Sequence, residues 1–503
     1  MLAALVVLSL AVHSHFVIHG CGEQDEARLA TDAIVWHRTG QLSPGFSDYR
    51  LWTSPLYLHG LKKALDWGVP PRALPDILNW SNVVFGTLTL IPMYLLLKRL
   101  ANERAALAAC ALYSFAPAFW LANIYGMPHL PSFGLFLTAL LLYARCLTPS
   151  LPKAPYSREP SGGVGFSLGS ALAAMCCMAA ACALKLDMVL CGGAFIGVLV
   201  CQRRGSPCGC TNPPTSCGGQ PRGLPLRVRN AAVGVGIVVM GVLLSLGYSR
   251  LLTPSAEALG ESATRQFPLE AAALFSGENL LPVVMAFGPV LFGAALAALA
   301  WCGLAHRRLA LLALLWGLPP LVHWGMKFGN SARHVLAPSL PLVLLVGVAL
   351  VSLLRTPRKA YVALGMLVLA NYAATGRSSD TVEPSSRIFE SAGDIQGRIS
   401  RLHASAREFV AARAEKKLLV GRWSNPYVLY EVVADARSIE VPATATSASG
   451  EMKVVTADGR TEQIAWVYVV GAPDVEALLA RRRQGWLLWT MQPGIAKALE
   501  VRK

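Results

Sequence analysis

Long apolar blocks alternate with short polar segments along the chain up to about residue 375. Most blocks approach or reach the roughly 17 to 25 residues that a helix needs to cross the hydrocarbon core of a bilayer. Leu, Ala, Gly and Val run through them without the period-2 alternation that a membrane β-barrel requires. The pattern therefore predicts a bundle of about eleven transmembrane helices, at residues 2–19, 77–97, 105–122, 129–147, 167–184, 187–201, 230–248, 281–304, 309–325, 335–354 and 360–375.

The first apolar block starts at the initiator Met without a basic segment, and no small-residue cleavage site precedes Cys21. It is expected to be a retained membrane span, with a cleaved signal peptide as the alternative.

After about residue 376 the pattern becomes that of a soluble domain, with charged residues scattered throughout. Leu418–Val420 and Ala465–Val470 have the composition of strands, and Ala472-Pro473-Asp474 opens an amphipathic helix that ends near Arg483. Alternating strand and helix signals favour a small α/β layer.

The expected fold is thus mainly α. A polytopic transmembrane helical bundle over residues 1–375, with a long first outer loop at 20–76, precedes a smaller α/β domain outside the cytoplasm at 376–503.

Composition strengthens the membrane prediction, because 54% of the residues are hydrophobic, 15% are charged and the mean hydropathy is +0.46. These values exclude an ordinary soluble protein, whose surface must be charged and wet. The net charge of +16 does not require nucleic acid, because many basic residues fall in short loops that the positive-inside rule places in the cytoplasm, near anionic lipid. These loop clusters are Lys98, Arg99 and Arg104; Arg203, Arg204, Arg222, Arg227 and Arg229; Arg307 and Arg308; and Arg355, Arg358 and Lys359.

This orientation places an acidic cluster, Glu23, Asp25 and Glu26, on the outer face where the first helix leaves the membrane. Carboxylates at a membrane boundary can accept a proton from a substrate hydroxyl or bind a divalent cation. The alternative is a solvated helix start, where acidic residues complement the helix dipole. Asp25 and Glu26 are candidate ligands of Mg²⁺ or Mn²⁺, although the sequence assigns no cofactor.

Aromatic and polar residues follow in the same outer loop. A substrate-contacting role and an interfacial aromatic belt account for them equally well. The candidate substrate-loop residues are Tyr49, Arg50, Trp52, Ser54 and Tyr57.

These residues resemble those of a known family. Asp25-Glu26-Ala27 after the first helix, Ser54-Pro55-Leu56-Tyr57 about thirty residues on, and the many later spans resemble the multi-spanning glycosyltransferases of the GT-C class. The similarity is to the bacterial branch related to protein O-mannosyltransferases and lipid A aminoarabinose transferases. The segment 119–128 resembles a short outer turn of that family, and 330–338 resembles its late Arg-Tyr-x-Leu-x-x-Pro motif.

Two positions depart from that pattern. His334 stands where the late motif usually has Tyr, and His129 stands where many relatives carry an acidic residue after the outer turn. The resemblance therefore rests on the order of the motifs and on topology.

The resemblance implies transfer of a sugar from a polyprenyl-phosphate donor to a lipid, glycan or protein acceptor on the outer face, with inversion. It places Asp25 as the base on the acceptor, with Glu26 and Glu23 as second choices. Fixed cations would stabilise the charge that develops on the departing phosphate. The candidate cations are Arg333, Lys327, His334, Lys185 and Arg265.

Arg333 is the first choice among these cations, because a guanidinium can bind phosphate oxygens bidentately. Its alternative role is an interfacial cation that reaches the lipid headgroups. Lys185 lies near Asp187 between two spans, where a structural pair is as good an interpretation as a functional one.

Two other classes of protein remain open. A transporter or flippase of a lipid-linked glycan would also have many spans, but such proteins usually bind substrate between internally repeated, broken helices near the bilayer midplane. No repeat is visible in this sequence. In a receptor or assembly factor, the C-terminal domain would be the working part.

Overall fold

The computed structural model describes most of the chain. The described residues are 1–22, 24–40, 54–116, 119, 126, 128–147, 167–201, 224–252, 283–284, 287–326, 336–354, 356–376, 392–421, 425–442, 449–467, 474–490 and 495–497.

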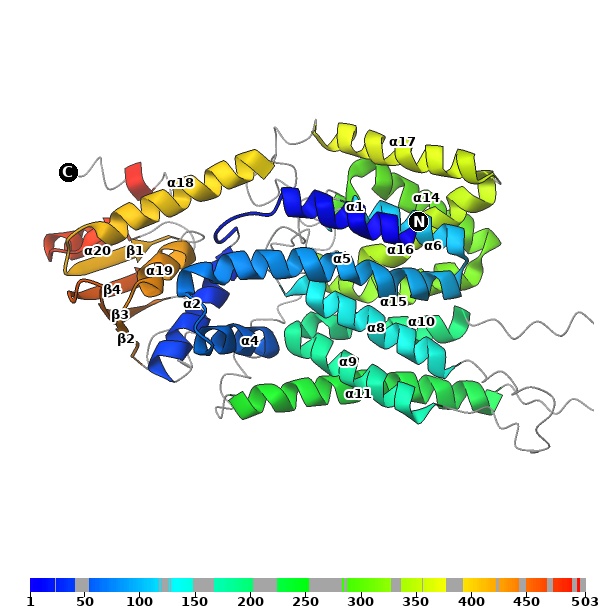
Figure 1. The fold of residues 1–503 in the computed structure, drawn as a ribbon, viewed down its shortest axis with the longest axis horizontal. Helices are drawn as coiled ribbons and strands as arrows, with labels where there is room; N and C mark the ends of the chain where they lie inside the picture. The colour runs from blue at the N-terminus through cyan, green and yellow to red at the C-terminus, as the bar shows by residue number, and fades with distance from the viewer. Residues whose placement is uncertain are drawn as a thin grey trace, which may run out of the picture.

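A bundle of helices lying side by side occupies one end of the molecule, and a small α/β layer occupies the other (Figure 1). The helices of the bundle are α1 (Leu2–His15), α5 (Leu74–Leu100), α6 (Glu103–Ser114), α8 (His129–Cys146), α9 (Leu168–Leu184), the 3-10 helix η2 (Leu186–Gly192), α10 (Gly193–Cys201), α11 (Leu224–Leu252), α14 (Pro289–Ala305), α15 (Arg307–Gly325), α16 (Leu336–Leu354) and α17 (Pro357–Gly376). The mainly helical architecture predicted from the sequence is confirmed.

Four of these elements are long and apolar enough to cross a membrane: Pro71–Leu100, His129–Cys146, Val228–Leu252 and Leu336–Leu354. The helices α1, α9 and α14, and the segment Leu186–Cys201, are apolar but shorter. In Val228–Leu252 only 22% of the most apolar window is buried, although its mean hydropathy is 2.2. Such an exposed apolar surface fits contact with lipid. The total of about eleven spans remains a prediction.

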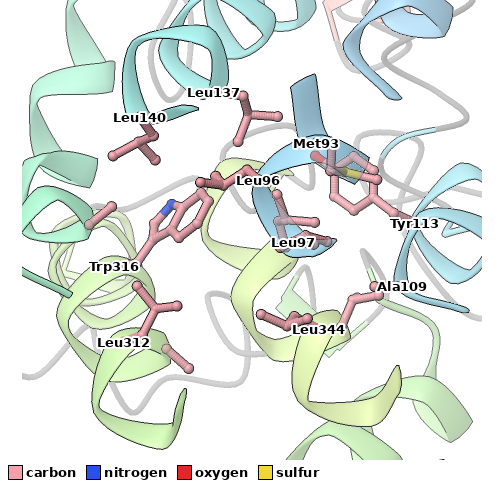
Figure 2. Packing of buried hydrophobic residues seen from close by; sticks show 14 of the residues in the cluster. Met93, Leu96, Leu97, Ala109, Tyr113, Leu137, Leu140, Leu312, Trp316 and Leu344 are labelled. Carbon is pink, nitrogen blue, oxygen red and sulfur yellow. The ribbon is translucent and has the colours of Figure 1, made fainter. Parts of the chain in front are cut away.

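Large apolar side chains and small residues together form the interior of the bundle. Figure 2 shows Trp316 of α15 pointing toward Leu96 of α5 and Leu140 of α8, and all three side chains are fully buried. Where α16 crosses α6, a Cβ at Gly347 would lie 2.8 Å from the carbonyl oxygen of Ala105. Small residues at such crossings let helix backbones approach closely, which is the usual packing of membrane helices.

The C-terminal segment folds into a five-stranded mixed sheet in the order β2-β3-β4-β1-β5. The strands are β1 (Lys416–Val420), β2 (Ser438–Glu440), β3 (Ser449–Val455), β4 (Thr461–Val467) and β5 (Leu487–Trp489). β1 pairs in parallel with β4 and β5, whereas β3 is antiparallel to β2 and β4. The strands expected near 418–420 and 465–470 are confirmed as far as residue 467.

Alternation along the strands gives the sheet two buried faces. Leu419 packs on one side in a core with α18 (Ala392–Ala411) and α19 (Asn425–Ala434), while Leu418 packs on the other with α20 (Val475–Arg483). Asp474 caps α20 by accepting a hydrogen bond from the backbone N–H of Ala477. The helix expected after residue 474 is confirmed, and it ends at Arg483 as expected.

The segment expected to be the first outer loop contributes two helices to this C-terminal layer. α2 (Gln24–Thr39) and α4 (Pro55–Asp66) share one hydrophobic core with α18, α19 and the sheet. Ala30 and Ile34 of α2 and Val433 of α19 are fully buried in it. The α/β layer is therefore packed directly onto the segment that carries the acidic cluster.

Candidate functional site

Asp25 and Glu26 of the acidic cluster lie in the first turn of α2, at the junction between the bundle and the α/β layer (Figure 1). Glu26 is fully buried, and its Oε2 accepts a 2.8 Å hydrogen bond from the backbone N–H of Gly22. Asp25 is partly open, with 28% of its side chain exposed, and one of its oxygens lies 3.9 Å from Nη1 of Arg28. Neighbouring positions on a helix project in different directions, so the two carboxylates have different surroundings.

Gly126, in the segment between α6 and α8, packs against Glu26. A Cβ at this position would lie 2.8 Å from Oε1 of Glu26 and 3.1 Å from Oδ1 of Asn79. The hydroxyl of Tyr57, on α4, donates a 3.1 Å hydrogen bond to the carbonyl oxygen of Gly126. Burial and the nearby carboxylate of Glu26 raise the pKa of Tyr57, so the phenol stays protonated and remains a donor.

Lys185 and Asp187 lie where α9 ends and η2 begins, with Nζ and Oδ2 3.5 Å apart. Both side chains are largely buried, at 11% and 16% exposed. Asp187 also lines a small cavity with His129, Trp324 and the first residues of α16. Its volume of about 20 Å³ has room for about one water molecule.

His129, at the start of α8, shares this mostly apolar lining with Asp187. Its side chain is only 4% exposed. Only the tertiary structure brings His129 and Asp187, which belong to separate elements, to one cavity.

Several of the predicted site residues lie outside the described part of the chain. They are Glu23, Tyr49, Arg50, Trp52, Arg265, Lys327, Arg333 and His334. Of the substrate-loop candidates, Ser54 is buried immediately before α4, and Tyr57 contacts Gly126. Asp25, Glu26 and Lys185 are the predicted catalytic and phosphate-binding residues that the structure does describe.

The sequence did not predict the residues of the C-terminal α/β layer that contact the segment around Arg72. Glu431 of α19 is fully buried and bonded to His403 of α18, and it also pairs with Arg72. No local sequence signal connects these positions, because Arg72 and Glu431 are separated by 359 residues.

Among the described residues, no group of three or more His, Cys, Asp and Glu side chains is arranged to hold a metal ion. Asp25 and Glu26 as ligands of Mg²⁺ or Mn²⁺ therefore remain a prediction. Because Glu26 is turned inward onto Gly22, the partly exposed Asp25 is the more accessible carboxylate.

Comparison with known proteins gives a clear result for the fold. No protein family and no curated protein sequence matches this chain significantly. The structure of ArnT from Cupriavidus metallidurans bound to undecaprenyl phosphate is 15% identical, with 85% of this chain and 84% of that chain covered at a TM-score of 0.51. The apo oligosaccharyltransferase of Archaeoglobus fulgidus is 13% identical, with 86% of this chain and 64% of that chain covered at a TM-score of 0.52.

The chain has a GT-C fold. ArnT, a lipid A aminoarabinose transferase, and the archaeal oligosaccharyltransferase AglB are both GT-C glycosyltransferases, so the structural resemblance inferred from the sequence motifs is confirmed. At these identities the comparison establishes the GT-C fold alone.

Proposed function

We propose that this chain is a glycosyltransferase of the GT-C type. It moves a sugar from a polyprenyl-phosphate donor to a lipid, glycan or protein acceptor on the outer face of the membrane, with inversion at the anomeric carbon. The observation that carries the proposal is the placement of the acidic turn of α2 at one end of a GT-C-type bundle, with the Lys185–Asp187 pair and His129 also near that end. The bundle at 1–375 holds the site, and the domain at 376–503 is packed against it.

Asp25 acts as the base in this proposal. A hydroxyl that attacks the anomeric carbon must lose its proton, and a carboxylate within hydrogen-bond reach can accept it. Asp25 is exposed enough to meet an acceptor, whereas Glu26 is enclosed and bonded to the backbone of Gly22. Glu26 is therefore assigned to holding the turn, and Glu23 is kept as a second choice for the base.

Cations at the same end would meet the departing phosphate. Lys185 is partly neutralised by Asp187, so it is a weaker candidate than Arg333, which belongs to the late outer segment just before α16. Lys327, His334 and Arg265 complete this proposed set. Fixed cations in a water-poor site stabilise developing phosphate charge without having to reorganise.

The ligands of the structural neighbours support a lipid-linked donor. A crystal structure of ArnT contains undecaprenyl phosphate, and a structure of AglB is a complex with an inhibitory peptide and a dolichol-phosphate. These ligands belong to those proteins. We propose the same class of donor here because the acidic turn occurs on the same fold.

The experiment that tests this proposal is transfer of radiolabelled sugar from polyprenyl-phosphate donors by membranes containing the protein at matched abundance. Asp25→Asn should lower the transfer rate by about 10²–10⁴-fold, the usual contribution of general base catalysis. Asp66→Asn is the matched control, because Asp66 is another acidic residue of the same outer region and pairs with Lys62 and His37.

Equal losses in both variants would remove the special role of Asp25. A transporter or flippase is the second candidate. Movement of a labelled lipid-linked glycan across vesicles, with no transfer from any donor, would favour it instead.

A further inference from the structure

A buried carboxylate of the α/β domain organises the contact with the first outer loop. Glu431 is fully buried, and its Oε1 lies 2.7 Å from Nδ1 of His403. Nη1 of Arg72, just before α5, also pairs with Glu431, and Arg407 lies 3.3 Å from it. Arg72 additionally donates from Nε to Asp435 over 2.8 Å. This cluster joins α18 and α19 to Arg72, at the start of α5.

His403 extends the cluster to the loop in front of α2. Its Nε2 lies 3.3 Å from the carbonyl oxygen of Cys21. A carbonyl and a carboxylate oxygen both accept hydrogen bonds, so a ring that satisfies both partners donates from both nitrogens. Gln396, also on α18, exchanges two hydrogen bonds with the backbone of His19, of 2.9 and 3.2 Å.

The opposite side of the same loop is bonded to α5. Asp76 accepts a 2.9 Å hydrogen bond from the N–H of Gly20, and Nδ2 of Asn79 donates to the carbonyl oxygens of Ile18 and Gly20 over 2.8 and 3.0 Å. Segment 18–22 is thus held between the bundle and the α/β domain. Its last residue, Gly22, provides the N–H that binds the carboxylate of Glu26.

We propose that His403 and Glu431 are positioning residues for sugar transfer. Through Cys21 and Gly22 they fix the first turn of α2, and with it the direction in which Asp25 meets the acceptor. The inference rests on the proposed function, and it gives the α/β domain a part in the reaction without contact with the reacting atoms. Misplacing a reacting group by about 1 Å can cost roughly 10²-fold in rate.

His403→Leu removes both hydrogen bonds, and His403→Gln retains the capacity for one. The expected result for His403→Leu is a fall in kcat for transfer of about 10- to 100-fold with the KM for the donor nearly unchanged, and His403→Gln should fall between it and the wild type. Glu431→Gln should resemble His403→Leu.

Glu462→Gln is the matched control. It alters another buried pair of the same domain, Lys417–Glu462 at 2.7 Å, which does not touch segment 18–22. A loss of activity caused merely by a weakened α/β domain would appear in this control as well.

Cys21 provides a second readout that does not depend on activity. Its thiol is fully buried within segment 18–22, so maleimide should label it slowly in the wild type. Labelling of the peptide that contains Cys21, measured by mass spectrometry, should rise several-fold in His403→Leu and Glu431→Gln but not in Glu462→Gln.

Faster labelling with unchanged transfer would show that the loop is held but does not position Asp25, which overturns the proposal. Unchanged labelling in His403→Leu would overturn it at the structural step. If the wild type transfers sugar from no donor, the proposed function is refuted, and so is a positioning role in that transfer. The labelling of Cys21 would still show whether the α/β domain fixes segment 18–22.

Discussion

Gly126→Ala should damage this protein far more than one added methyl group normally would. The new Cβ would overlap the Cβ of Leu78 on α5 and lie 2.8 Å from Oε1 of Glu26. Leu78 is almost completely buried, and its Cβ moves only with the backbone of α5. Overpacking of this kind costs about 1–3 kcal/mol, and the residue that can still move is Glu26, whose displacement would disturb the acidic turn.

Gly60→Ala is the matched control. Gly60 is exposed within α4, and a Cβ there meets no atom within 4 Å. Replacing glycine by alanine in an open helix position should raise stability by about 0.5–1 kcal/mol.

The assay is thermal unfolding of the purified proteins in one lipid nanodisc preparation, followed by tryptophan fluorescence, together with the transfer rate. We expect Gly126→Ala to melt below the wild type and Gly60→Ala at or above it, and transfer to fall in Gly126→Ala alone. If both variants melt and react like the wild type, the close packing of Gly126 against Leu78 and Glu26 is wrong.

Three further outcomes are expected. Lys417→Met should lower stability by about 3 kcal/mol in chemical unfolding, because it removes the buried cation next to Glu462 and leaves only the more exposed Arg460 at 3.7 Å; a change below about 1 kcal/mol would contradict this. Tyr57→Phe should cost about 1 kcal/mol through loss of the bond to Gly126, with a normal melting curve as the contrary result. Burial alone would raise the pKa of Glu431, but hydrogen bonds from His403 and Arg72 lower it below its ordinary range. A carboxyl with a lowered pKa contributes stability that is complete above its ordinary pKa of about 4.3 and is lost as pH falls through the folded-state value. The melting temperature, measured down to about pH 3, should therefore fall less steeply with pH in Glu431→Gln than in the wild type. Parallel curves for the two proteins would contradict this prediction.

The helical bundle could be predicted because lipid imposes a simple rule on sequence. Every backbone polar group in the membrane must be bonded within the chain, so long apolar runs become helices. α8 and α16 lie almost where the pattern expected them. α6 was harder, because its apolar run continues to residue 122 while the helix ends at Ser114.

The interior of the first outer loop could not be predicted in the same way. From the sequence, apolar residues such as Ala30 and Ile34 could pack equally well against lipid, the bundle or a distant domain. Only folding shows that α2 completes the core of a sheet formed more than 370 residues later. Likewise, Asp25 and Glu26 are equivalent in the sequence, and their different burial follows from the packing of Gly126 and Gly22.

The sequence by itself determined that this is a membrane helical protein with a C-terminal α/β layer and an acidic turn after its first helix, since periodicity, hydropathy and local motifs are properties of neighbouring residues. Tertiary structure alone decided that Glu26 is enclosed, that His129 and Asp187 share a cavity, and that Glu431 and His403 hold the segment before α2. Each of these contacts joins residues from separate elements, and their energies depend on burial and distance, which exist only after the chain has folded.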